Sequence, residues 1–194
     1  MEPIITYRNY YENLLKDDAE ICIPQSWKLV NLSNISIIQE GAGIRTYQYR
    51  SEGIHLLTVT NILDGSIDPN ISKKYINYEE FLSKYKHLKL KKGDIVTACS
   101  GGSWGKCAIF NLDEEFMLNT STLRLRFFGD EGDNNYLYML AKSAFFKNQL
   151  LKQLSGMQPN FGYSHYKKII VPLPPLMEQQ RIVAKLKKIF YQFC

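Results

Sequence analysis

The sequence predicts an α+β protein in which helices flank a mixed, mostly antiparallel twisted sheet and a final helix protrudes. Three observations predict this. Short apolar runs, rich in β-branched residues, are bounded by glycine or Asp-Gly turns, as strands are. Two of these runs, at 95–99 and 107–110, flank a glycine-rich loop and therefore predict a hairpin. Two further segments, at 136–154 and after Pro175, carry apolar residues at helical spacing.

The composition is that of an ordinary soluble globular protein. The 194 residues suffice for one domain with an appended element, and 45% are hydrophobic and 22% charged. No apolar run approaches the roughly 20 residues of a membrane span, and the N-terminus lacks the pattern of a secretory signal. We therefore expect a cytoplasmic protein with reduced cysteines and no membrane contact. With no CxxC pair and three widely separated histidines, we expect no metal site.

The first half of the chain alternates strand and turn signals. Residues 1–22 predict a helix around 10–15 and then an acidic, loose stretch. Glycines at 41–43 interrupt an apolar run. The segment 53–61 reads as a strand, because it is rich in branched residues and is bounded by glycine at each side. A helix is expected around 78–86.

The loop of the predicted hairpin is not a nucleotide-binding P-loop. Ser100 stands where that motif needs glycine, Cys107 follows the lysine where Ser or Thr is required, and a strand follows rather than a helix. The glycines permit close approach of the backbone to a partner, and Ser100, Ser103 and Lys106 offer donors for phosphates or base edges. A purely structural turn remains the alternative.

Beyond the hairpin we expect one strand over 115–128, an acidic turn at 129–135 and one helix over 136–154 whose apolar stripe belongs to the core. A polar, aromatic and glycine-bearing loop follows at 155–166. It contains Gln158 and Asn160, whose side-chain amides are of the type that forms two hydrogen bonds with one adenine base.

The charge pattern suggests that the protein binds a polyanion. The net charge of +5 alone barely favours nucleic acid. However, lysines crowd the segment 84–92, whereas acidic residues gather elsewhere, at 113–115 and 130–133. A surface with segregated charge is what phosphate binding requires. A solvated, lysine-rich turn is the alternative.

The last apolar run, at 169–171, predicts a buried strand that the following Pro-Leu-Pro-Pro sequence ends, since proline lacks the N–H donor. A helix begins next, with Pro175 in its first turn and Glu178 near its positive end. Apolar residues then recur at intervals of three, four and three, which predicts a seam for a partner helix. These residues are Val183, Leu186, Phe190 and Phe193.

This junction resembles the one between the target recognition domain and the conserved helix in specificity subunits of type I restriction–modification systems. The resemblance rests on Pro-Leu-Pro-Pro-Leu at 172–176, Glu-Gln at 178–179 and Arg-Ile-Val at 181–183. The glycine hairpin resembles the central hairpin of that family. Looser similarities are a Pro-x-x-Trp segment at 24–27, Thr-Asn-Ile at 60–62 and the loop that begins at Gly156.

The resemblance implies three segments: an N-terminal helical or linker segment at 1–22, a DNA target recognition domain at 23–173, and the start of a conserved coiled-coil helix at 174–194. It implies recognition of one half of a bipartite DNA target on behalf of separate methyltransferase and restriction subunits. Family chains usually hold two recognition domains. With one domain and about half a helix, this chain is expected to be a half-size or truncated subunit that pairs through its helix, in a homodimer or with another partner.

The expected contacts with double-stranded DNA lie on the loops and in the lysine-rich segment. They are Arg45, Tyr47, Thr60, Asn61, Lys84, Lys86, Lys89, Lys91, Ser100, Ser103, Lys106, Gln158 and Asn160.

Motifs of catalysis are missing from the sequence. It contains no Asp-x-Lys or Glu-x-Lys triplet of a nuclease, no Asn-Pro-Pro-aromatic tetrapeptide of an adenine methyltransferase and no Gly-x-Ser-x-Gly elbow. We therefore expect a non-catalytic subunit without a cofactor. Two alternatives remain: the recognition domain of a fused restriction–methylation enzyme, and a helix-mediated interaction module that never contacts DNA.

Overall fold

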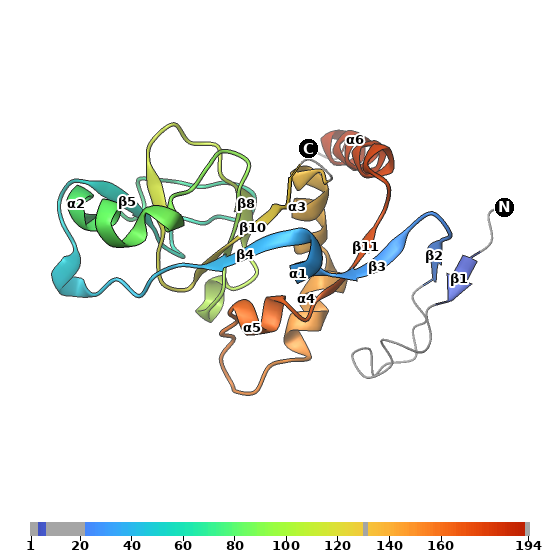
Figure 1. Cartoon of the computed structure of the whole chain (residues 1–194), viewed down its shortest axis with the longest axis horizontal. Coiled ribbons are helices and arrows are strands. Elements are labelled where there is room, and N and C mark those ends of the chain that lie inside the picture. The colour runs from blue at the N-terminus through green and yellow to red at the C-terminus, as the bar shows by residue number, and fades with distance from the viewer. Residues whose placement is uncertain (1–3, 7–21, 130–131, 193–194) are drawn as a thin grey trace.

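A four-stranded antiparallel sheet forms the centre of the molecule (Figure 1). The computed structural model describes residues 4–6, 22–129 and 132–192. The register of the sheet places Leu125 between Ile38 on one side and Ile95 on the other. In spatial order the strands are β4 (Ser36–Glu40), β10 (Thr122–Phe127), β7 (Ile95–Ala98) and β8 (Cys107–Ile109).

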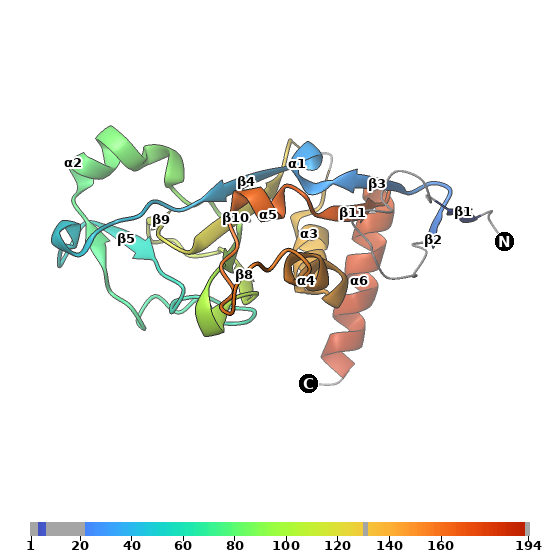
Figure 2. The same ribbon diagram turned by 90° about the horizontal axis from the view of Figure 1, so that it is seen from below.

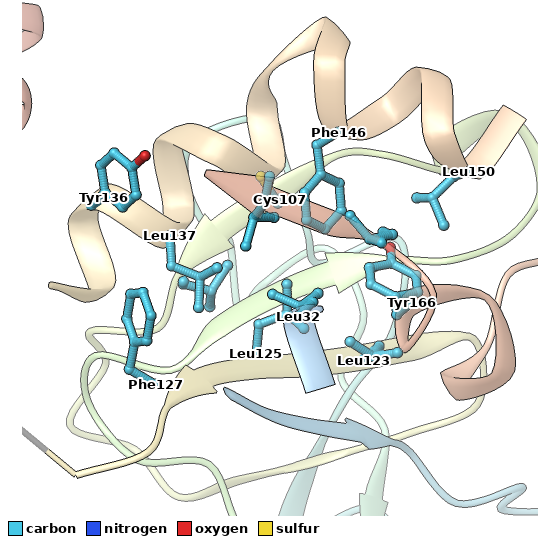
Figure 3. Packing of buried hydrophobic residues seen from close by; sticks show 14 of the residues in the cluster. Leu32, Cys107, Leu123, Leu125, Phe127, Tyr136, Leu137, Phe146, Leu150 and Tyr166 are labelled. Carbon is cyan, nitrogen blue, oxygen red and sulfur yellow. The ribbon is translucent and has the colours of Figure 1, made fainter. Parts of the chain in front are cut away.

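The central sheet contributes buried side chains to a core on each of its faces. On β10, Leu123, Leu125 and Phe127 face the larger core, which the helices α3 and α4 cover (Figure 3). On the other face, Val96 and Ala98 join a second core beneath a smaller sheet. The helices are α3 (Asn134–Lys142) and α4 (Ala144–Leu151), and the strands of the smaller sheet are β6 (Tyr75–Ile76), β5 (Ile54–Leu57) and β9 (Phe116–Leu118).

Two ribbons and a long helix complete the fold. In the first ribbon β11 pairs with β3 antiparallel, and in the second β1 pairs with β2. The helix α6 (Leu176–Gln192) packs its first turns against α3, and Figure 2 shows its C-terminal part extending away from the sheets. The remaining bounds are β1 (Ile4–Thr6), β2 (Cys22–Pro24), β3 (Lys28–Asn31), α1 (Leu32–Ile35) and β11 (Ile170–Leu173).

This architecture confirms the predicted α+β fold with a mostly antiparallel sheet, flanking helices and a C-terminal helix. One pair, β5 with β9, is parallel. The hairpin of β7 and β8 is present as predicted. No helix among the described residues has both the length and the apolarity to cross a membrane. The helix expected around 10–15 lies outside the described residues, as do Phe193 and the acidic pair at 130–131.

Two expected elements are each split in two. The strand expected over 115–128 is β9 and β10, which belong to different sheets and are joined by a turn in which Ser121 has φ of +62°. The helix expected over 136–154 breaks at Ser143, whose ψ of 150° is extended. The Ser143 hydroxyl accepts a hydrogen bond from the Phe146 N–H at 3.2 Å and thereby caps α4.

The prolines do not end the last strand where expected. β11 continues through Pro172 to Leu173, opposite Leu29 and Lys28. Proline is tolerated because β11 belongs to a two-stranded ribbon, in which one edge needs no donor. The carbonyl of Pro172 instead accepts a hydrogen bond from the Tyr136 hydroxyl at 2.9 Å, so the strand is attached to α3.

Candidate nucleic-acid interface

Loops from distant parts of the chain gather at one end of the central sheet. Because the sheet is antiparallel, β4 and β7 end where β10 and β8 begin. The segments 41–45, 99–106 and 119–121 therefore all emerge at this end, which we call the loop end.

The segment 99–106, which we call the hairpin loop, depends on glycine for its shape. Gly101 and Gly105 have φ of +61° and +74°, conformations that other residues adopt only with strain. One 3₁₀ turn, η4 (Gly101–Ser103), forms the tip. A Cβ atom at Gly101 would meet nothing within 4 Å, so the tip is open to a partner. The Gly105 N–H donates to the carbonyl of Ala98 at 2.9 Å, which closes the loop at its base.

The segment 155–162, which we call the C-terminal loop, is fastened directly to the hairpin loop. The Gly101 N–H donates to the Pro159 carbonyl at 3.1 Å, and the Phe161 N–H donates to the Cys99 carbonyl at 2.9 Å. The rings of Trp104 and Phe161 pack at 5.3 Å between centroids.

Folding thus brings together five of the predicted contact residues that are far apart in sequence. Ser100 and Asn160 form a bridge between the two loops. Gln158 and Asn160 are exposed, and Ser100, Ser103 and Lys106 are partly exposed. Next to them, Met157 is 100% exposed. The two loops form one polar surface that projects an apolar side chain.

The C-terminal loop is also held at its far end. It leads into α5 (Tyr163–Tyr166), whose first N–H donates to the carboxylate of Glu40 at the end of β4. The Tyr166 side chain lies in the larger core among Phe146, Leu123 and Leu150 (Figure 3). The loop is therefore supported by both the sheet and the core.

The segment after β5 borders the other side of the hairpin. The Gly65 N–H donates to the Cys107 carbonyl at 2.9 Å, which places the turn at 62–66 along β8. Thr60 is exposed, and its hydroxyl lies 2.8 Å from that of Thr58.

Asn61 does not have the position expected of a DNA contact. Its side chain is 0% exposed. Its oxygen accepts hydrogen bonds from Thr58, and its nitrogen donates to the carbonyls of Asp68 at 3.0 Å and Ser72 at 3.1 Å. Asn61 holds the loop in shape, and the structure contradicts its assignment to the contact surface.

Arg45 and Tyr47 lie on a separate projection. Both are exposed, Tyr47 by 80%, on the turn η1 (Thr46–Gln48). The Gln48 side chain accepts from the Arg45 N–H at 2.9 Å and donates to Glu80 at 2.8 Å. This ties η1 to α2 (Tyr78–Glu80), at the left in Figure 1.

The lysine-rich segment is largely neutralised by carboxylates. Lys92 lies 2.5 Å from Asp113, Lys84 lies 3.4 Å from Glu80, and Lys89 is paired with Glu115. The expectation that the acids at 113–115 lie elsewhere is therefore wrong. Of the predicted lysines in this segment, Lys86 and Lys91 are exposed and have no ion pair among the described residues. The segment covers the end of η2 (Phe81–Tyr85) and all of η3 (Lys86–Leu88).

Two arginines of β10 hold this segment through a buried carboxylate. Asp94 is 0% exposed and accepts from Arg126 at 2.6 Å, from Arg124 at 3.2 Å and from the Lys91 N–H at 2.7 Å. Arg124 also donates to the Lys89 carbonyl at 2.8 Å. The alternation of arginine with apolar residues on β10 was the sequence signal for this arrangement, since charged residues on a buried strand need partners.

Both cysteines at the loop end are buried, and burial raises the pKa of each. The pKa of Cys99 and that of Cys107 rise from the ordinary 9.0 to about 12. Each thiol is therefore neutral at physiological pH. Among the described residues no cluster of three His, Cys, Asp or Glu side chains is arranged to hold a metal ion.

The seam predicted on the last helix is divided between the interior and the surface. Val183 is 5% exposed and belongs to the larger core, and Leu186 is half-buried. By contrast, Ile189 is 40% exposed and Phe190 57%. Val183 therefore serves the chain's own core, which contradicts its assignment to a partner helix.

Gln179, which was not among the predicted site residues, fastens the start of α6. It is 1% exposed, accepts from the Asp133 N–H at 2.9 Å and donates to the Pro174 carbonyl at 2.9 Å. Glu178 instead pairs with Arg181 on the surface at 2.6 Å. Of the Glu-Gln pair at the junction, only the buried glutamine therefore ties the start of α6 to the rest of the described domain.

The described residues thus form a sheet with joined loops at one end and a C-terminal helix whose first turns pack against α3. Residues 24–193 match the family described as type I restriction modification DNA specificity domain, and the chain belongs to this family. This confirms the resemblance drawn from the proline junction and the hairpin.

Similar proteins agree with this assignment. The specificity subunit of the type I restriction enzyme MjaVIII from Methanocaldococcus jannaschii is 31% identical over 174 residues, covering 86% of this chain and 40% of that subunit. The EcoBI specificity subunit from Escherichia coli is 25% identical over 184 residues, covering 90% of this chain and 37% of that subunit. This chain thus spans about 40% of the length of the first of these relatives.

Solved structures share the fold. The HsdS subunit from Thermoanaerobacter tengcongensis superposes with a TM-score of 0.67 at 22% identity, over 92% of this chain and 41% of that one. The S subunit from M. genitalium gives a TM-score of 0.54 at 16% identity, over 87% and 40% of the two chains.

Proposed function

We propose that this chain is a DNA target recognition domain that reads one half of a bipartite sequence and directs methyltransferase and restriction subunits to it. The observation that carries the proposal is the joining of the hairpin loop and the C-terminal loop at one end of the sheet. This joining concentrates amides, hydroxyls and a lysine on one exposed surface, in a chain of the DNA specificity domain family.

The exposed side chains of the two loops are proposed to read bases. Gln158 and Asn160 have amides that pair with adenine in two places, and Ser100 and Ser103 have hydroxyls that accept or donate. Lys106 is assigned to a phosphate. Arg45, Tyr47 and Thr60 are proposed as outlying contacts, because each is exposed beside the loop end or on η1.

The lysine-rich segment is given a smaller part. Lys86 and Lys91 are proposed to attract DNA over a distance. Lys84 and Lys89 would have to leave carboxylate partners first, so each adds less.

The chain itself is proposed to be non-catalytic and cytoplasmic, with methylation and cleavage performed by partner subunits. Residues 23–173 form the proposed recognition domain. The exposed part of α6, with Leu186 and Phe190, is proposed to pair with another helix, in a homodimer or against the methyltransferase.

The test is co-expression with the cognate methylation subunit and base-resolution mapping of methylated adenines. A single interrupted motif is expected, symmetric if two copies of the chain pair. Gln158→Ala and Asn160→Ala are expected to relax the motif at one position each, since a bidentate base contact is worth about 1–3 kcal/mol of discrimination. Asn70→Ala, an exposed amide outside the two loops, is the control and leaves the motif unchanged.

Two results would contradict the proposal. An unchanged motif in both loop variants would move base reading away from these loops. Failure to bind any duplex, even at low salt with the methylation subunit present, would favour the interaction module, for which the 57% exposure of Phe190 is the supporting observation.

A further inference from the structure

A lysine on α4 stands over the hairpin loop. The buried side chains of Phe146 and Leu150 set the rotation of α4 by facing the larger core (Figure 3). Lys147, which follows Phe146, is turned toward Gly105. A Cβ atom built on Gly105 would lie 3.4 Å from Cε of Lys147 and 3.8 Å from both its Cδ and its Nζ. The alkyl stem of Lys147 therefore lies across the backbone of the loop.

Gly105 makes this contact available. The absence of a side chain lets the stem of Lys147 approach the loop backbone. Gly105 also adopts a φ of +74°, and the next residue in the chain is Lys106. The hairpin loop is thus accompanied by two lysines, one within it and one lying over it. A charged side chain commonly buries its stem while its amino group stays in water.

Among the described residues, Lys147 lacks the carboxylate partner that several other lysines of the chain have. Within the part of the chain that the structure describes, neither Lys147 nor Lys106 forms an ion pair, whereas Lys84, Lys89 and Lys92 each do. Lys142, the last residue of α3, is also paired, with Asp64 at 3.2 Å. The hairpin loop therefore carries one lysine, Lys106, without a carboxylate partner in the described ranges, and has a second, Lys147, lying against it at Gly105.

We propose that Lys147 is a phosphate-binding residue of the DNA interface, which together with Lys106 holds one strand of the backbone against the hairpin loop. This inference rests on the proposed function. Because the stem of Lys147 already lies on the loop, binding a phosphate immobilises less of the side chain than it would for a lysine in open solvent. The contact is to the backbone and carries no sequence information.

The experiment measures binding of fluorescent duplexes to the chain in complex with its methylation subunit, across about 50–200 mM salt. One duplex carries the mapped target and one does not. Lys147→Ala is expected to reduce the slope of log K against log salt by about 0.9, the change expected for one lost phosphate contact. It should weaken both duplexes by the same factor and leave the methylation motif unaltered.

Two further variants make the test specific. Lys147→Arg keeps the charge and should keep the slope. Lys28→Ala, which removes an exposed lysine on β3, should change nothing. A melting temperature of Lys147→Ala equal to that of the unmodified chain excludes a folding effect.

The outcomes separate this inference from the function on which it rests. If the unmodified complex binds no duplex, the proposed function fails. If it binds and Lys147→Ala keeps the full salt slope, Lys147 is not a phosphate contact and only this inference fails. If Lys147→Ala weakens the target duplex alone, the residue reads bases, and the inference is again overturned.

Discussion

At the scale of single residues, Asp94 is a buried carboxylate whose role is structural. Asp94 is fully buried and accepts from two arginines and from a backbone N–H of the lysine-rich segment. Its task is to fix that segment onto the face of β10 that carries Arg124 and Arg126. A buried ion pair adds little over an apolar pair, but breaking it leaves a charge without a partner.

Asp94→Ala is expected to lower the free energy of unfolding by about 3–5 kcal/mol, because both arginines lose their carboxylate. Equilibrium urea unfolding measures this. The control is Asp113→Ala, whose carboxylate is 96% exposed and pairs with Lys92, and which should cost much less than Asp94→Ala because an exposed ion pair contributes little. Equal costs for the two variants would remove the structural role assigned to Asp94.

The two buried thiols predict a response to alkali. Burial raises the pKa of Cys99 and of Cys107 to about 12, and burial also raises the pKa of Tyr136 and Tyr166. For a thiol the neutral form is favoured on folding. The stability that each buried thiol contributes is therefore fully present below the ordinary pKa of 9.0 and is lost as the pH rises toward about 12.

Alkylation followed by mass spectrometry tests this directly. At about pH 8 we expect Cys99 and Cys107 to stay unmodified in the native chain and to react fully in urea, because only the thiolate reacts. The midpoint of urea unfolding should fall on going to about pH 11. Native-state modification as fast as that of the unfolded chain would show that burial does not protect these thiols.

At the scale of elements, α6 has two parts with different tasks. Gln179 and Val183 bind its first turns to the domain, whereas Ile189 and Phe190 near its end are exposed. A helix of 17 residues is about 25 Å long, so the exposed end stands well clear of the sheets.

Val183→Ala and Phe190→Ala should therefore have opposite effects. The first removes buried methyl groups and should cost about 1–3 kcal/mol of unfolding free energy, with little effect on association. The second should leave unfolding unchanged and weaken self-association or binding of the methylation subunit. Urea unfolding and sedimentation velocity measure the two quantities.

A different pattern would argue against this division of α6. If Phe190→Ala unfolded as easily as Val183→Ala, the end of the helix would be packed on the domain. If neither variant altered association, the proposed pairing through the end of α6 would be wrong.

At the scale of the whole molecule, folding decides which of the lysines are paired with carboxylates and which are not. The lysines at 84–92 are prominent in the sequence, yet the turn at 113–115 folds against them and supplies Asp113 and Glu115. Lys106 and Lys147 are isolated in the sequence, yet both lie at the joined loops. Local charge density therefore gave a misleading map of the basic surface.

Local patterns predicted the elements whose signals are themselves local. The hairpin followed from two apolar runs around a glycine loop, and the last helix followed from Pro175, Glu178 and its apolar spacing. The breaks at 119–121 and at Ser143 were missed, because each depends on a single residue whose conformation is decided by the sheets and helices around it.

The sequence by itself determined the fold class, the family through the proline junction and the hairpin, and the polar character of the two loops. Only the tertiary structure decided that Cys99 and Gly101 meet Phe161 and Pro159, that Asn61 and Val183 face inward, and that Asp113 and Glu115 neutralise Lys92 and Lys89. The reason is physical. Periodicity and turn chemistry act between neighbours in the chain, whereas burial and ion pairing depend on which distant segments the packed core brings into contact.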